Sequence, residues 1–79
     1  MKREFKAGEY VHVPAETMVW DMDDRGDVKS YLRIQSPVAL MCLGSHRDYK
    51  FNDSIMYNVF YEGKVFSVSE DDVYSLENR

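Results

Sequence analysis

The feature that most constrains the fold of this chain is a predicted β-hairpin spanning residues 55–68. Two runs of aromatic and β-branched residues flank Glu62-Gly63, and glycine at the second position of a two-residue turn readily takes a positive φ. The resulting register groups four apolar side chains into a core patch on one face, namely Tyr57, Val59, Phe66 and Val68. Phe60 and Val65 fall on the opposite face, so something must cover this outer pair.

Other segments show the alternation that is typical of strands, in which successive side chains face opposite sides. Val11 and Val13 share one face of the first such segment, and Leu32 and Ile34 share one face of a later segment. Both pairs are therefore expected to point into a core. Outside the hairpin, strands are predicted at residues 10–14, 38–43 and 73–76. Residues 17–20 and 28–35 are predicted to be the two extended arms of a long hairpin-like excursion with a polar tip.

Three further predictions concern the second half of the chain. The apolar run 38–43 is too short for a confident helix and is bounded by proline and glycine, which indicates a central strand covered on both faces. The polar stretch 45–54 is expected to be a loop between two antiparallel strands. Ser69 precedes three acidic residues, a pattern that favours a helical turn over 69–72 before the last strand.

The length of 79 residues leaves room for one domain, spanning 1–79, and Cys42 has no second cysteine with which to form an intramolecular disulfide. A lone thiol in an apolar run is typical of a reducing compartment, which predicts a soluble cytoplasmic protein. No window approaches the roughly 20 apolar residues of a membrane span, and the first residues are too polar for a signal peptide. The expected fold is all-β, with five to six short antiparallel strands.

The opening FKAGEYVHVP and the closing YNVFYEGKVFSVSEDDVYSL resemble the SH3-like small-barrel superfamily, which includes the KOW and Tudor modules. The resemblance implies a closed barrel whose last strand follows a short helical turn. The combined pattern is also similar to small accessory proteins of large tailed bacteriophages, which would place the chain in a host cytoplasm or in a virion as a structural component. The aromatic motifs of peptide-binding SH3 domains are absent, because Trp20 lies before the acidic loop, so binding of proline-rich ligands is not expected.

Two relatives within that superfamily suggest alternative ligands. KOW-like barrels bind nucleic acid, and a stacking surface could be formed here by Arg25, Lys29, Arg33, Arg47 and Lys50 with Tyr31 and Tyr49. The net charge of −4 and the scatter of these cations among acids favour ordinary surface charge instead. Tudor-like recognition of methylated side chains would require Tyr10, Trp20 and Tyr31 to converge with Asp21 or Asp27.

Metal and catalytic sites are weighed against simpler interpretations. Asp21, Asp23, Gly26 and Asp27 match parts of a calcium loop, but Arg25 and Leu32 stand where oxygen ligands are needed, so a solvated turn is favoured. Cys42, His46, His12 and Asp48 lack the paired spacing of zinc sites. Burial of Cys42 between apolar neighbours would suppress a reactive thiolate, and no catalytic motif is present. We therefore expect no enzyme activity, cofactor or metal.

The leading functional hypothesis is a non-catalytic module that binds a protein partner with a basic patch. The acidic loop 21–27 follows Trp20 and precedes Tyr31, and Phe60 and Val65 form an outer apolar pair. Self-association through that pair is a related hypothesis. The predicted binding residues are Trp20, Asp21, Asp23, Asp24, Asp27, Tyr31, Phe60 and Val65.

Overall fold

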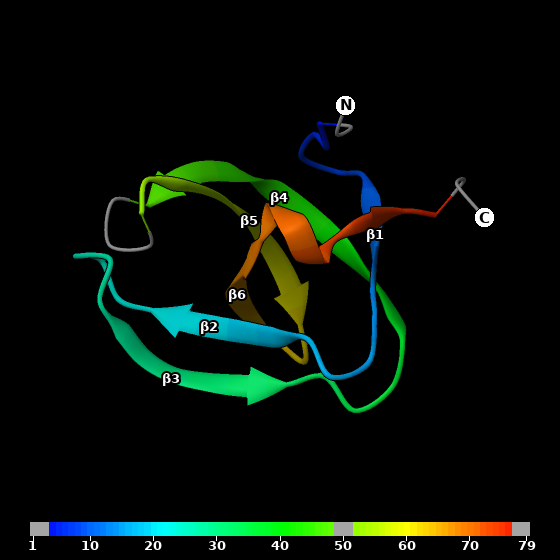
Figure 1. Cartoon of the computed structure of the whole chain (residues 1–79), viewed down its shortest axis with the longest axis horizontal. Coiled ribbons are helices and arrows are strands. Elements are labelled where there is room, and N and C mark those ends of the chain that lie inside the picture. The colour runs from blue at the N-terminus through cyan, green and yellow to red at the C-terminus, as the bar shows by residue number, and fades with distance from the viewer. Residues whose placement is uncertain (1–3, 49–51, 77–79) are drawn as a thin grey trace.

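The computed structural model describes residues 4–48 and 52–76, which form one antiparallel sheet (Figure 1). The hydrogen-bonded strand order is β3-β2-β6-β5-β4-β1-β7. The strands are β1 (Tyr10–Val13), β2 (Met18–Met22), β3 (Val28–Arg33), β4 (Val38–Asp48), β5 (Ser54–Tyr61), β6 (Lys64–Ser69) and β7 (Tyr74–Ser75). The predicted all-β fold is confirmed. Two details of the prediction are wrong: the described residues form seven strands rather than five to six, and the sheet is not closed into a barrel, because the end strands β3 and β7 do not pair.

The predicted hairpin is confirmed in every residue pair. β5 and β6 pair from Tyr61 with Lys64 to Tyr57 with Val68, in the register set by a two-residue turn. Glu62 has a φ of 49° and Gly63 a φ of 81°, the two positive values that a type I′ turn requires. This turn matches the twist of the flanking strands, so the local sequence fixes the register without help from the rest of the chain.

The core lies on one face of the curled sheet. The predicted core patch is buried, together with Val11, Val13 and Ile34 from the strands that alternate in the sequence. Phe5 joins this core from the N-terminal segment, where its backbone N–H donates to the Tyr57 hydroxyl at 3.2 Å and its ring meets the Tyr57 ring edge-on. Because successive side chains of a strand point to opposite sides, the side chains that do not enter the core form a second face on the other side of the sheet.

β4 departs from its prediction because of a β-bulge. The strand runs for 11 residues to Asp48 instead of ending at Leu43, so the predicted loop 45–54 is wrong over residues 45–48, and also at Ser54, where β5 begins. Residues 49–51 lie outside the described part. Cys42 pairs with Val59 and Gly44 with Asn58, which leaves Leu43 as an extra residue that is 40% exposed. β4 is thus covered on one face here, not on both as predicted.

Among the described strands, the arm formed by β2 and β3 is hydrogen-bonded to the rest of the sheet through β6. The two strands β2 and β6 share a single paired position, Trp20 with Ser67. One residue further along β2, the Asp21 carboxylate accepts a hydrogen bond from the Lys64 ammonium at 2.7 Å. Asp21 is only 7% exposed, so its predicted place in a solvated loop is wrong: β2 extends through Met22 and carries Asp21 inward beside Lys64.

The predicted helical turn is confirmed as a 3₁₀ turn over Glu70–Asp72. The Ser69 hydroxyl caps it by accepting a hydrogen bond from the Asp71 backbone N–H at 3.2 Å. The predicted last strand follows as the two-residue β7, which pairs with β1. Within residues 4–48 and 52–76 there is no helix with the length and apolar character needed to cross a membrane.

Candidate functional site

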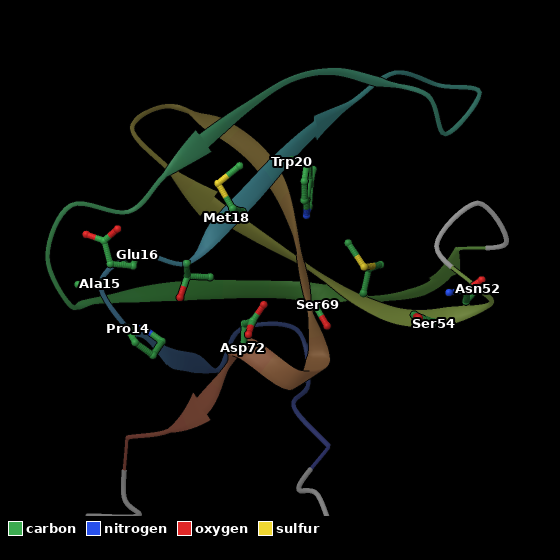
Figure 2. Close-up of a pocket in the computed structure, with 11 residues that line it drawn as sticks. Pro14, Ala15, Glu16, Met18, Trp20, Asn52, Ser54, Ser69 and Asp72 are labelled. Atoms are coloured by element: carbon green, nitrogen blue, oxygen red, sulfur yellow. The ribbon is translucent and has the colours of Figure 1, made fainter.

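The second face of the sheet carries a large hollow beside the place where β2 and β6 separate. Its volume is about 700 Å³, and its lining comes from three separate stretches of the chain, residues 14–20, 52–56 and 69–72. Trp20 and Met18 lie on one side, with Ser69 and Asp72 across from them (Figure 2). Met56 lines the same hollow and is 1% exposed, although it lies outside the main core cluster. Apolar side chains are therefore packed on this face as well, beneath an open depression.

The charges around this larger hollow are negative. Glu16 and Asp72 are the charged residues among those that line it. Glu16 forms an exposed ion pair with Arg33 at 3.1 Å, and within the described residues Asp72 makes no ion pair. Glu16 also has a φ of 73°, a conformation that costs a non-glycine residue about 1–2 kcal/mol. The turn that bears Glu16 is thus held in place by its neighbours, including the Glu16 N–H that donates to the Ile34 carbonyl at 2.7 Å.

A smaller hollow of about 300 Å³ continues along the same face. On β2, β5 and β6 the larger hollow is lined by Trp20, Met56 and Ser69. Two residues further along the same strands, the smaller hollow is lined by Met22, Asn58 and Ser67. We call the two hollows together the interaction groove. Its middle is small and polar, since the Ser67 hydroxyl donates to the Asn58 side-chain oxygen at 3.2 Å.

The tip of the β2–β3 hairpin forms one wall of the smaller hollow. Asp23, Asp24 and Gly26 come from this tip, and His46 faces them from β4. The Asp23 carboxylate accepts the backbone N–H groups of Arg25 and Asp27, each at 2.9 Å, so it stabilises the turn. Asp24 is exposed and, in the part of the chain that the structure describes, forms no ion pair.

The predicted binding residues fall into four groups. Trp20, Asp23 and Asp24 line the interaction groove, and Val65 borders its smaller hollow. Tyr31 is 64% exposed on β3, next to the Trp20 ring at 5.8 Å between centroids, and Asp27 is exposed near the hairpin tip. Phe60 is 49% exposed on the same face outside the groove. Asp21 alone is turned away from the groove, toward Lys64 and Ser30.

The pKa of the Asp21 carboxyl is lowered, chiefly by its hydrogen bond to the Lys64 ammonium. Partial burial opposes this effect, while the positive charges of Lys29 and Lys64 and the Ser30 hydroxyl add to it. Asp21 therefore stays ionised and joins the β2–β3 arm to β6. Its role is structural, which the sequence did not indicate.

The described residues do not form the arrangements that the metal-binding and nucleic-acid-binding hypotheses require. These contain no group of three or more His, Cys, Asp or Glu side chains placed to hold a metal ion. Cys42 points into the core and His46 onto the opposite face, because the bulge lies between them. Arg33 pairs with Glu16 and Arg47 with Asp53 at 3.3 Å, while Tyr49 and Lys50 lie outside the described residues.

The Tudor-like cluster is only partly assembled. Trp20 and Tyr31 are neighbours across β2 and β3. Tyr10 lies on β1, which β6, β5 and β4 separate from β2 in the strand order. The three aromatic residues therefore do not stand on adjacent strands.

Sequence reasoning missed Met18, Met56 and Asp72 as groove residues. For Met56 a signal did exist: the hairpin register placed it on the outer face, where a large apolar side chain needs cover. Nothing in the sequence could show that β2 supplies this cover from more than 30 positions away. Comparison with protein-family models, with curated proteins and with solved structures finds no match to this chain.

Proposed function

We propose that this protein is a non-catalytic module that binds a cationic segment of another protein in the interaction groove. One observation carries the proposal: four carboxylates line the two hollows, those of Glu16, Asp23, Asp24 and Asp72, and the lining residues that the structure describes include no lysine or arginine. The same lining also contains a tryptophan and methionines. This combination suits a ligand that is both apolar and positively charged.

Lysine and arginine side chains meet both requirements. Their aliphatic stems pack along apolar surface while the charged head remains at the rim. A cation over the face of a tryptophan ring gains about 0.5–2 kcal/mol, depending on its exposure to water. Methionine adds an adaptable surface that accommodates different apolar neighbours. The expected ligand is therefore a segment in which lysine or arginine stands beside apolar residues.

We also propose that the chain is related to the SH3-like modules. Its support is the antiparallel strand order together with the sequence of final hairpin, helical turn and closing strand. An experimental structure at high resolution would test the relation, since an SH3-like arrangement requires the β2–β3 arm to cross the β5–β6 hairpin as the two halves of a barrel. A flat sheet would contradict it.

The binding proposal can be tested with the tryptophan itself. Trp20 is the only tryptophan of the chain, so its fluorescence reports directly on the groove. Peptides selected from a random displayed library on the immobilised protein are expected to be enriched in lysine or arginine next to apolar residues. Titration of a selected peptide is expected to shift the Trp20 emission, and the affinity is expected to fall as salt rises, because salt screens exposed charges.

Variants distinguish binding in the groove from nonspecific attraction of a cationic peptide to an acidic protein. Asp72→Asn and Asp24→Asn are each expected to weaken binding of the selected peptide several-fold, and Trp20→Ala to weaken it at least as much; binding is measured here by calorimetry, because Trp20→Ala removes the fluorophore. Glu62→Gln is the matched control, because this exposed carboxylate lies on the β5–β6 turn and lines neither hollow. Equal losses from Glu62→Gln and Asp72→Asn, or enrichment of acidic peptides, would contradict the proposal.

Nucleic acid is the alternative ligand, and a gel-retardation assay distinguishes it from a cationic peptide. A nucleic-acid-binding module is expected to retard a single-stranded oligonucleotide at low salt and to lose affinity when Arg33 is replaced. Arg33 is engaged by Glu16, and the groove walls repel phosphates, so we expect no retardation. Retardation that depends on Arg33 but not on Trp20 would favour the nucleic-acid function.

A further inference from the structure

Each hollow of the interaction groove contains a carboxylate that forms no ion pair within the described residues. In the larger hollow it is Asp72, which is half-buried and lies across from Met18 and Trp20 (Figure 2). In the smaller hollow it is Asp24, which is exposed on the tip of the β2–β3 hairpin. Each hollow can therefore accept one cation without breaking an ion pair of the fold.

The other two carboxylates described in the lining have roles within the fold. Glu16 forms its ion pair with Arg33 at 3.1 Å. Asp23 accepts two backbone N–H groups of the hairpin tip, each at 2.9 Å. A bound cation would compete with these contacts, whereas at Asp72 and Asp24 it adds a new charge pair. The negative charge that is available to a ligand is thus divided between the two ends of the groove.

The pairing of Trp20 with Ser67 sets the distance between these ends. Ser69, the last residue of β6 before the 3₁₀ turn, stands two residues beyond Ser67. Met22, the last residue of β2 before the hairpin tip, stands two residues beyond Trp20 in the opposite direction, because β2 and β6 are antiparallel. A strand rises about 3.3 Å per residue, so the levels of Ser69 and Met22 are roughly 13 Å apart.

We propose that the ligand is an extended segment with two cationic residues roughly four to six positions apart, one for each end of the groove. Four positions of an extended chain span about 13 Å and six span about 20 Å, a range that includes carboxylates lying beyond the strand ends. This ligand rests on the proposed function, which requires one cation beside apolar residues. The second cation and its distance from the first are the new elements.

The shape of the sheet favours a ligand that runs along the strands. The sheet curls around the core across its strands, so a ligand lying across them would soon leave the convex surface (Figure 1). A ligand that follows β2 and β6 can reach both hollows. Midway it passes the hydrogen bond from the Ser67 hydroxyl to Asn58. The residues between the two cations are therefore expected to be small and uncharged.

The two ends of the groove differ in what they offer to the ligand. The larger hollow, of about 700 Å³, is lined by Met18, Trp20 and Met56, so it also takes the apolar residue of the ligand. The smaller hollow, of about 300 Å³, offers the second cation an exposed charge pair with Asp24. Exposed charge pairs are weak, so the second cation should strengthen binding about two- to fivefold.

Synthetic peptides with linkers of different length test the spacing. Each acetylated and amidated peptide carries a leucine and an arginine, a linker of roughly one to seven serines and a second arginine. Titrations are followed by Trp20 fluorescence. We expect the tightest binding at roughly three to five serines, which place the arginines four to six positions apart. Binding should be about two- to fivefold weaker at one serine, because that linker cannot span the two ends.

Three variants assign the two cations to their carboxylates. Asp24→Asn should abolish the dependence on linker length, because the second arginine then lacks a charged partner at every distance. Asp72→Asn should weaken all the peptides and also flatten the dependence. Glu62→Gln is the matched control and should keep the optimum, since Glu62 lies on the β5–β6 turn and lines neither hollow. Urea denaturation of each variant checks that the fold is intact.

The proposed function and the two-cation ligand fail separately. Equal affinity at every linker length, or an optimum at one or two serines, would overturn the two-cation ligand while the peptides still bind through one arginine. An optimum that persists in Asp24→Asn would also overturn it. If neither these peptides nor those selected from the displayed library bind, the proposed function fails and the two-cation ligand with it.

Discussion

Replacement of Gly44 by alanine should destabilise the protein through its backbone alone. Gly44 follows the bulged Leu43 and has a φ of 129°, outside the regions that a residue with a Cβ tolerates. A Cβ built at this position meets no atom within 4 Å, so no collision with a neighbour adds to the cost. A residue held in such a conformation costs about 1–3 kcal/mol, which fixes the expected loss for Gly44→Ala.

This loss is large enough to measure. In a domain of this size each kcal/mol shifts Tm by about 4–8 °C, so the expected decrease for Gly44→Ala is roughly 5–20 °C. Urea denaturation followed by Trp20 fluorescence should give a lower midpoint with an unchanged slope. Ser45→Ala is the control at the next, exposed position, where a change of less than about 0.5 kcal/mol is expected.

A chemically synthesised chain with D-alanine at position 44 separates the two physical causes. D-residues favour positive φ, so Gly44→D-Ala should be at least as stable as the native chain, partly because it restricts the unfolded state. If the D-residue and the L-residue destabilised the protein equally, lack of space rather than backbone conformation would be the cause. Native-like stability of Gly44→Ala would refute the assigned φ and with it the bulge.

The other predictions concern an ion pair, a turn and the floor of the groove. The folded-state pKa of Asp21 is lowered. The Asp21–Lys64 pair therefore contributes its full stability above about pH 4 and loses it as the pH falls through that lowered pKa. Melting curves between about pH 2 and 7 should show this decline in the native chain and a weaker one in Asp21→Asn. Glu62→Asn should raise the free energy of unfolding by about 0.5–1 kcal/mol, because asparagine tolerates the φ of 49° better than glutamate, as urea denaturation will measure. Met56→Ala should cost about 2–3 kcal/mol in the same assay, since Met56 is 1% exposed; a cost below about 0.5 kcal/mol would show that the floor of the larger hollow is not packed.

The candidate site was only partly predictable. Trp20, Asp23 and Asp24 were selected from the sequence because an aromatic residue stood beside an acidic loop, and all three line the groove. Asp21 belongs to the same acidic segment of the sequence, but it lies in β2 and forms an ion pair with Lys64. An aspartate within an acidic run is usually solvated, and only a lysine 43 positions away reverses that expectation.

What the sequence determined by itself is the structure encoded within a few neighbouring residues. The β5–β6 register, the turn at Glu62-Gly63, the inward valines of β1 and the capped turn at Ser69 all follow from local geometry and alternation, and all are confirmed. The tertiary structure alone decided where the β2–β3 arm lies, because its single pairing, Trp20 with Ser67, joins segments that share no local signal. It also decided which way the second half of β4 faces, since the one extra residue at Leu43 inverts the alternation of every side chain that follows. The placement of the arm and the bulge in β4 together create the groove. Local preferences act over only a few residues, whereas a surface depends on how distant segments pack against one another.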